Sequence, residues 1–458
     1  MSRAQLWALG VLSLLATALV LFEGGRGAVE APLALRTAAQ SERTITTPLL
    51  ASAITAEQDT DDDASGDEEP AEDDAAETVE SFDDTAVAES AAEEPAATAD
   101  EEAPAEEETS DEGTDDAPTD PNADAAAPKP TKIRHVFVIA LAGHGFDAAF
   151  GPQSSAPYLA GRLRPRGVVL EGFRALGAAQ LPDHLAQVGG QPPNAQTSAD
   201  CPSFTEIPLA TTPTRTGEIR ADGCVFPNTV TTIGDQLTAS RRVWRAYVQD
   251  LDKGPERRAT CRRPASNAAD DTLRDRAGDG YATRRNPFVY FHSLLDLGDC
   301  DALDGPLERL ERDLGKVATT PNYSYVAPNL CNSGSESPCA DGSPGGLPAA
   351  DAFLASWVPK ILASPAYRRD GLLIVTFAGR TVAAGAPAPA AADLRNGALL
   401  LSRFAAAGTT AGGDYDPYSL LRSIEDLFAL RPLARAATAR SFAPTVLGNA
   451  YVTPPGDG

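Results

Sequence analysis

Two apolar segments decide the fold of this chain: RHVFVIAL at Arg134–Leu141 and GLLIVTF at Gly371–Phe377. Both are rich in Val, Ile and Leu with little polar alternation, a pattern typical of strands buried on both faces of a sheet. The first segment runs into Ala142-Gly143-His144-Gly145 and the second into Ala378-Gly379-Arg380. The sequence therefore predicts two interior strands whose ends carry few polar side chains.

Further strand-like and helix-like segments alternate along the chain. The other strand-like runs are Val168–Phe173, Val243–Val248, Tyr323–Ala327 and Ala398–Leu401. The helix-like segments are Pro157–Leu163, Thr231–Arg241, Pro306–Lys316, Ala349–Leu362 and Tyr418–Leu430. This alternation predicts an α/β fold, a three-layer α/β/α sandwich with a mainly parallel central sheet. In such sheets the functional loops follow the carboxyl ends of the strands, where the Ala- and Gly-rich segments fall.

The charge of the chain is concentrated in one segment. Of its 65 acidic residues, 30 lie between Glu57 and Asp124, which leaves 35 acidic against 38 basic residues elsewhere. We expect residues 23–128 to be a disordered linker, with an acidic stalk at 57–128, because this segment has too few apolar residues to offset the entropy of folding. The nearly neutral remainder argues against a nucleic-acid partner.

The N-terminus predicts export from the cytoplasm. An uncharged apolar run of 17 residues extends from Leu6 to Phe22, long for a signal peptide and short for a membrane-spanning helix. Residues 1–22 are therefore interpreted as a cytoplasmic tip with either a signal-anchor or a cleaved signal peptide. The folded domain is expected at 129–445, with a C-terminal tail at 446–458. The expected location is extracytoplasmic, membrane-anchored or secreted.

The cysteines fit an exported protein. Six of them lie in the expected folded part, at Cys201, Cys224, Cys261, Cys300, Cys331 and Cys339. An even number in this context favours disulfides, and six cysteines allow 15 pairings. Sequential pairing (201–224, 261–300, 331–339) is the preferred hypothesis because it closes three short loops. A thiolate metal site is the alternative, although no Cys-x-x-Cys pair is present.

A set of short motifs occurs in one order along the folded part. They are Ile133–Ile139, Ser155–Leu159, Leu181–Ala186, Asn286–Phe291, Pro328–Asn332 and Tyr418–Phe428. Together they resemble the bacterial phosphoesterase family, which contains acid phosphatases and phospholipase-C-type enzymes of the alkaline phosphatase superfamily. The resemblance implies an alkaline-phosphatase-like fold and a metal-dependent phosphoric ester hydrolase, in which a divalent metal polarises the phosphate and a hydroxyl nucleophile attacks it.

The positions that carry this chemistry in the family hold different residue types here. Ala142 and Gly143 stand where the resemblance implies Glu and Asn ligands, and Ala378 and Gly379 stand where it implies Asp and Glu. Gln180 occupies the nucleophile position. Three expected His ligands are also missing: Arg285 and Pro417 replace two, and the loop after Asn332 lacks the third. Because no intact ligand or nucleophile remains, no metal or other cofactor is expected unless the protein is an active hydrolase.

A few reactive side chains remain near the expected cleft: His144, Asp183, His184 and Arg285. His144 is interpreted as a remnant of the family's site. Asp183 is interpreted as a polar residue of a helix, although its side chain could still reach the cleft. Asp183 and His184 are not expected to act as a pair, because adjacent helical residues point about 100° apart. The Arg284-Arg285 pair is interpreted as solvated loop charge, with a phosphate-binding role as the alternative.

The other two histidines have no predicted function. His135 is expected to be a satisfied, buried strand residue, and His292 has no visible partner in the sequence.

Three functional hypotheses remain open. The first is a catalytically impaired pseudoenzyme whose former cleft binds an anionic small molecule or a surface protein. The second is an active phosphatase or phosphodiesterase with a weakened or re-sited active site. The third is an inert domain on an acidic stalk. In each case the N-terminal apolar segment is the expected contact with the membrane.

Overall fold

A computed structural model describes residues 132–381 and 389–451. The expected membrane anchor, the acidic stalk and residues 452–458 lie outside the described residues. Within the described residues, no helix is long and apolar enough to cross a membrane.

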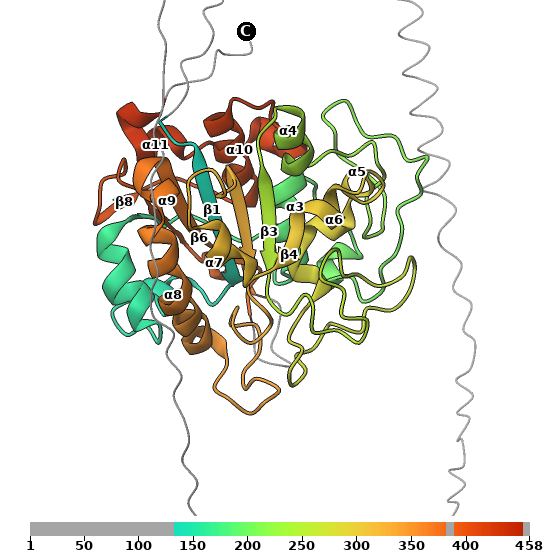
Figure 1. The fold of residues 1–458 in the computed structure, drawn as a ribbon, viewed down its shortest axis with the longest axis horizontal. Coiled ribbons are helices and arrows are strands. Elements are labelled where there is room, and N and C mark those ends of the chain that lie inside the picture. Colours follow the sequence, from blue (N-terminus) through green and yellow to red (C-terminus); the bar gives the residue numbers. More distant parts are fainter. Residues whose placement is uncertain (1–131, 382–388, 452–458) are drawn as a thin grey trace, which may run out of the picture. The chain divides into compact units, whose positions relative to one another are not determined.

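The eight strands found in the described residues form one sheet in the order β4-β3-β5-β1-β6-β7-β2-β8 (Figure 1). The strands are β1 His135–Ala142, β2 Val168–Leu170, β3 Trp244–Val248, β4 Asp304–Pro306, β5 Tyr323–Ala327, β6 Gly371–Ala378, β7 Ala398–Leu401 and β8 Thr409–Ala411. Neighbouring strands are parallel except where β7 pairs with β6 and β2. The predicted mainly parallel sheet is confirmed.

Helices and short helical turns connect the strands. The α-helices are α2 Phe146–Phe150, α3 Leu181–Gly189, α4 Ile233–Ala239, α5 His292–Leu295, α6 Asp299–Leu303, α7 Arg309–Asp313, α8 Gly346–Ala363, α9 Pro365–Asp370, α10 Pro417–Phe428 and α11 Ala443–Leu447. Leu159–Leu163 is a π-helical turn. The 3₁₀ turns are Arg164–Arg166, Thr197–Ala199, Thr283–Arg285, Pro287–Tyr290, Ala391–Leu394, Ala434–Thr438 and Gly448–Ala450.

Strand β1 shows why the sheet has a helical layer on each face. All eight of its residues are buried. Because successive side chains of a strand point to opposite faces, Val136 and Val138 join one hydrophobic core while Phe137 and Ile139 join the other. The two cores confirm the predicted three-layer sandwich.

The long helices complete these two cores. Helix α8 packs Phe353, Leu354 and Val358 into the core that contains Phe137, and α10 packs Leu420 and Ile424 into the opposite core. Helix α10 begins where its sequence favours a start. Asp416 accepts a hydrogen bond from the Ser419 backbone N–H at 2.9 Å, and Pro417 follows at the first helical position.

The structure differs from the sequence prediction mainly at short elements. Strands β4 and β8 are three residues each and were not predicted. The predicted helix Pro306–Lys316 contracts to α7, because Asp304–Pro306 pairs with β3 as an edge strand. At the C-terminus, α11 and a 3₁₀ turn carry buried Val446, Leu447 and Ala450 past the expected boundary at 445.

The cysteines form the disulfides Cys201–Cys224, Cys261–Cys300 and Cys331–Cys339. The sequential pairing is confirmed, and the thiolate metal alternative is wrong because the sulfurs are bonded to one another. Three disulfides are typical of a protein that folds outside the cytoplasm.

Candidate functional site

The inherited site lies where three neighbouring strands end. Strands β5, β1 and β6 are adjacent and parallel, so the segments that follow Ala327, Ala142 and Ala378 meet at one edge of the sheet. The Gly143 backbone N–H donates to the Ala378 carbonyl at 3.0 Å, and the Ala142 N–H donates to the Ser333 carbonyl at 2.9 Å. These strand ends therefore meet through backbone groups, because Ala and Gly provide no side-chain ligand.

Asn396 takes up the space beside Gly143. Its side-chain amide donates to the Gly379 carbonyl at 2.8 Å and accepts from the Gly145 N–H at 3.1 Å. A Cβ atom added at Gly143 would lie 2.1 Å from the Gly379 oxygen and 2.5 Å from the Asn396 amide nitrogen. A larger residue at 143, such as the Asn that the family resemblance implies, does not fit this arrangement.

Asp183 links helix α3 to the end of β6. One carboxylate oxygen accepts from the Gly379 N–H at 2.8 Å and the other from the Leu176 N–H at 2.8 Å. Asp183 therefore does reach the strand ends, but it binds backbone there. Its complete burial raises the pKa of this carboxyl to about 8, although the two backbone donors act in the opposite direction.

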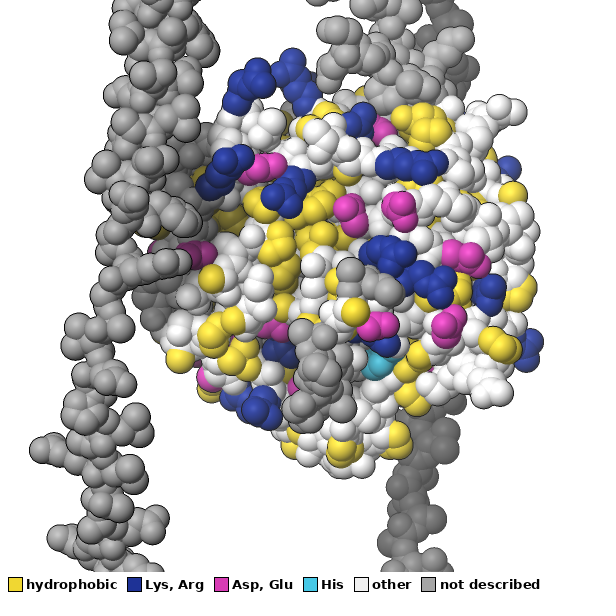
Figure 2. Space-filling view, turned by 180° about the vertical axis from the view of Figure 1, so that it is seen from behind, with side chains coloured by type: hydrophobic (Ala, Val, Ile, Leu, Met, Phe, Trp, Pro, Cys, Tyr) yellow, Lys and Arg dark blue, Asp and Glu magenta, His cyan; other side chains and the backbone are white. Residues whose placement is uncertain are grey.

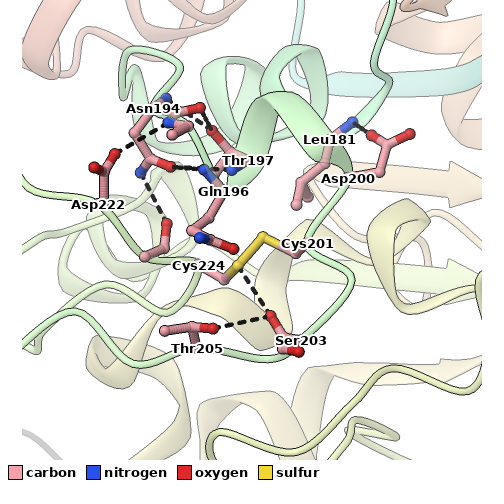
Figure 3. The surroundings of a disulfide bond; sticks show 12 residues. Leu181, Asn194, Gln196, Thr197, Asp200, Cys201, Ser203, Thr205, Asp222 and Cys224 are labelled. Atoms are coloured by element: carbon pink, nitrogen blue, oxygen red, sulfur yellow. Dashed lines mark hydrogen bonds between the residues drawn. A yellow bond between two sulfur atoms is a disulfide. The ribbon is translucent and has the colours of Figure 1, made fainter. Parts of the chain in front are cut away.

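The start of helix α3 is already capped by a carboxylate. Gln180 directly precedes the helix, and one oxygen of Asp200 accepts from both the Gln180 and Leu181 N–H groups at 2.8 Å. Figure 3 shows the bond to Leu181. These are the unpaired donors that make a helix N-terminus attractive to an anion. Burial raises the pKa of Asp200, with Arg284 opposing this shift. Asp200 thus occupies the position at the helix end that an anionic ligand would take.

Arg285 lies inside the site and is almost inaccessible, with 1% of its surface exposed. Its guanidinium donates to the Gln180 side-chain oxygen at 2.6 Å, to the Pro328 carbonyl at 2.8 Å, and to the Ala140 carbonyl. Within the described residues no carboxylate lies within ion-pair distance of it. Burial lowers the pKa of Arg285 to about 9, so the side chain remains a cation at neutral pH. The prediction of a solvated charge at Arg285 is wrong, because the guanidinium bridges three segments of the site.

Gln180 is fixed by the same network. Its side chain contacts the Ser335 hydroxyl, with the amide nitrogen at 2.9 Å and the amide oxygen at 3.2 Å. Ser335 in turn contacts the Ser333 hydroxyl at 2.9 Å. An amide cannot act as the attacking hydroxyl, and here it orients the Arg285 guanidinium.

The two histidines near the site are isolated from the acidic groups. The His184 Nδ1 lies 2.7 Å from the Tyr325 hydroxyl on β5, so His184 and Asp183 have different partners, as predicted. Burial keeps the pKa of His184 well below its usual value, and Arg285 adds to this shift. His144, which follows the end of β1, lies next to Gly334. Burial lowers its pKa, and the nearby Arg380 lowers it further.

The remaining histidines lie elsewhere. His135 hydrogen-bonds Asp370 and is buried, which confirms its predicted structural role. The expectation that His292 has no partner is wrong: its ring nitrogens each lie 2.9 Å from a carboxylate, one of Glu206 and one of Asp296.

The residues at the strand ends do not fit a divalent metal. Hard cations require several oxygen or nitrogen ligands, and positions 142, 143, 378 and 379 have none in their side chains. Within the described residues, His, Cys, Asp and Glu gather closely enough for a metal in two places, Cys261/Cys300/Asp304 and Asp275/Cys331/Cys339. Both sets depend on cysteines that are tied up in disulfides.

Several residues that fill the site were missed by the sequence analysis, notably Asp200, Ser335 and Asn396. Each is a common polar residue in a loop, and no motif marks it. Only Asp200 has a local signal, since it precedes a disulfide cysteine.

Comparison with known proteins assigns the family. The phosphoesterase family matches residues 158–431, and the chain belongs to this family. No curated protein matches the chain in sequence. The mainly parallel sheet with a hydrophobic core on each face confirms the predicted α/β fold class.

Solved structures of similar fold are remote in sequence. One is a protein in the alkaline phosphatase superfamily from Vibrio parahaemolyticus (13% identity, 69% of this chain and 72% of that chain, TM-score 0.40). Another is the lipoteichoic acid synthase LtaP from Listeria monocytogenes (10% identity, 68% and 77%, TM-score 0.37). A third is the PsFucS1 sulfatase from Pseudoalteromonas sp. (10% identity, 70% and 74%, TM-score 0.41). These likenesses concern the fold alone.

Gly379 is predicted to be intolerant of any side chain. Its φ is +64°, and an added Cβ would lie 2.5 Å from the Ala178 carbonyl oxygen. Gly379→Ala is expected to lower the free energy of unfolding by about 1–3 kcal/mol, and Gly379→Glu by more. Chemical denaturation measures this. The control is Gly177→Ala, where nothing lies within 4 Å of the added atom; equal stability of the two alanine variants would contradict the prediction.

Asp183 is predicted to make stability depend on pH. Because the folded-state pKa is raised from 3.8 to about 8, the folded protein holds this proton more tightly than the unfolded chain. Its stabilising contribution is complete below about pH 4 and is lost as the pH rises towards 8, with a slope of at most about 1.4 kcal/mol per pH unit. The Asp183→Asn variant should show a shallower fall in unfolding free energy across this range. Parallel curves for the two proteins would show that Asp183 does not titrate in this way.

Removal of the Arg285 guanidinium is predicted to destabilise the domain strongly. Arg285→Met leaves two buried carbonyls and the Gln180 oxygen without this donor, at a cost of about 3 kcal/mol or more. Arg274→Met, an exposed arginine on a neighbouring loop, serves as the control and should change stability little. The comparison requires only thermal and urea unfolding of the two variants, and similar losses would refute a special role for Arg285.

Proposed function

We propose that this protein is an exported member of the phosphoesterase family that does not hydrolyse phosphate esters and acts by binding. The observation that carries this proposal is the Arg285 guanidinium beside Gln180, at the position of the expected nucleophile. A fixed, buried cation stands where the family resemblance implies a metal ligand. The positions of the family's nucleophile and of one metal ligand are thus occupied by Gln180 and Arg285, which bind each other.

The other contacts of the site support the same proposal. Asn396 fills the space at Gly143, Asp183 holds the Gly379 backbone, and Asp200 caps the start of helix α3. A phosphate ester entering here would meet the Asp200 carboxylate at the start of α3, which repels it. The nucleophile position would offer it the Gln180 amide instead of a hydroxyl. The protein therefore needs no divalent metal.

The proposed setting is outside the cytoplasm, with the protein either held to the membrane by its N-terminal apolar segment or secreted. An anionic small molecule or a surface protein is the proposed partner of the former cleft. Nucleic acid is not proposed as a partner. On the face shown in Figure 2, basic side chains are interspersed with acidic ones, without the broad basic area that nucleic acid requires.

A hydrolase with a re-sited active centre is the second candidate. The observation that favours it is His144, whose ring nitrogen Nε2 is buried without a hydrogen-bond partner among the described residues. Burial lowers the pKa of His144, so a neutral ring is available to accept a proton. Among the described residues, no hydroxyl group forms a hydrogen bond with its Nε2.

The two candidates predict different results in one assay. The full-length protein is tested for hydrolysis of p-nitrophenyl phosphate and bis(p-nitrophenyl) phosphate with Mn²⁺, Zn²⁺, Mg²⁺, Ca²⁺ or a chelator, and its metal content is measured. We expect no turnover above the protein-free background and no stoichiometric metal. Chelator-sensitive turnover would overturn the binding proposal; metal-independent turnover that is abolished by His144→Ala would establish the second candidate.

A further inference from the structure

A charged groove lies apart from the inherited site. It consists of two adjoining cavities of about 360 and 210 Å³, which share Glu256, Arg258, Arg263 and the Pro264-Ala265 pair as lining residues. None of the strand-end residues described above lines either cavity. A ligand in this groove would therefore bind independently of the inherited centre, whether or not that centre is catalytic.

One wall of the groove is rich in arginines, some of which have no acidic partner in the described part of the chain. The segment 253–263 reads KGPERRATCRR, with five basic residues and one acidic. Arg262 is already held by both oxygens of Asp279, at 2.6 and 2.7 Å. Arg263 donates only to the Cys261 carbonyl at 3.2 Å, and Arg258 forms an exposed pair with Glu256 at 3.1 Å. Within the described residues, no acidic side chain lies within ion-pair distance of Arg257 or Arg263.

The other wall of the groove carries two carboxylates, which are hydrogen-bond acceptors. His292 lies between Glu206 and Asp296, at 2.9 Å from each, and the Ser266 hydroxyl donates to Glu206. Burial would lower the pKa of His292, but the hydrogen bonds to Asp296 and Glu206 outweigh it and raise the pKa. With one ring nitrogen on each, His292 holds the two carboxylates apart, and their remaining lone pairs can accept hydrogen bonds from hydroxyl groups.

Disulfides and backbone pairing hold both walls in place. Cys261–Cys300 anchors the arginine segment, and the Cys261 N–H also donates to Asp304 at 3.1 Å. Glu206, on the other wall, belongs to the loop that Cys201–Cys224 closes, with Ser203 and Thr205 beside that disulfide (Figure 3). The Phe204 N–H donates to the Ala268 carbonyl at 2.7 Å, which joins the two walls. A preformed groove loses little entropy when a ligand binds.

We propose that this groove binds an anionic polysaccharide. The arginines hold its sulfate, phosphate or carboxylate groups, and the carboxylates and Ser266 hold its hydroxyls. The mixed charge of the lining disfavours a dense polyanion that has no hydroxyls to offer. Nucleic acid fits poorly as well, because Phe204 is the one Phe, Tyr or Trp among the residues that line the two cavities, and at 2% exposure it offers no face on which a base could stack.

The test uses the full-length protein, dextran sulfate as the probe and uncharged dextran as its matched control, with calorimetry at low ionic strength and a chelator present. We expect dextran sulfate to bind and dextran not to bind. Arg258→Ser/Arg263→Ser should weaken binding about tenfold or more, since hydrogen bonds to charged groups are lost. Arg162→Ser/Arg215→Ser removes the same charge from exposed positions outside the groove and should leave binding unchanged. If the double variant misfolds, Arg258→Ser alone carries the test.

Three results would overturn the proposal. They are no binding of dextran sulfate, an equal loss of binding in the two double variants, and displacement of dextran sulfate by inorganic polyphosphate charge for charge. The last result would mean that the groove recognises charge without recognising a saccharide. Because binding is measured with a chelator and without turnover, its outcome is independent of the phosphate-ester assay.

Discussion

The buried guanidinium of Arg285 is the constraint on which the arrangement of the strand ends depends. A cation with 1% exposure has lost nearly all its water and must be compensated by the protein. Here the compensation comes from the Ala140 and Pro328 carbonyls and the Gln180 amide oxygen, which are neutral groups from β1, the end of β5 and the start of α3. Each of these three segments must keep its place. Withdrawal of any one acceptor would leave one buried N–H group of the guanidinium without a partner.

Around this cation three polar side chains bind backbone groups of the protein. Asp200 takes the free N–H groups at the start of α3, Asp183 takes the N–H of Gly379, and Asn396 bridges Gly145 to Gly379. In a metal-dependent hydrolase such groups would be held in readiness for an ion and a phosphate. In this chain their hydrogen-bonding capacity is used within the protein, which is the condition for a stable fold without the ion.

The fold was predictable from the sequence because burial on both faces leaves a clear signal. The runs that became β1 and β6 have no polar alternation, and all eight residues of each are buried. The lack of side-chain donor atoms at positions 142, 143, 378 and 379 was also visible, since these residues are Ala and Gly. The burial of Arg285 was not predictable, because a pair of arginines in a loop is usually solvated. The pairing of His292 with Glu206 was equally hidden, since Glu206 lies 86 positions away in the sequence.

The hydrophobic cores and the loops at the strand ends are separate parts of this fold. The two hydrophobic cores lie on the faces of the sheet, whereas the ligand positions lie in loops at its edge, so these loops can change without loss of core packing. Loops without a metal need other constraints. Cys331–Cys339 closes the loop that brings Ser335 into contact with Gln180. The other two disulfides hold the walls of the charged groove. Covalent links thus help to keep both regions in shape.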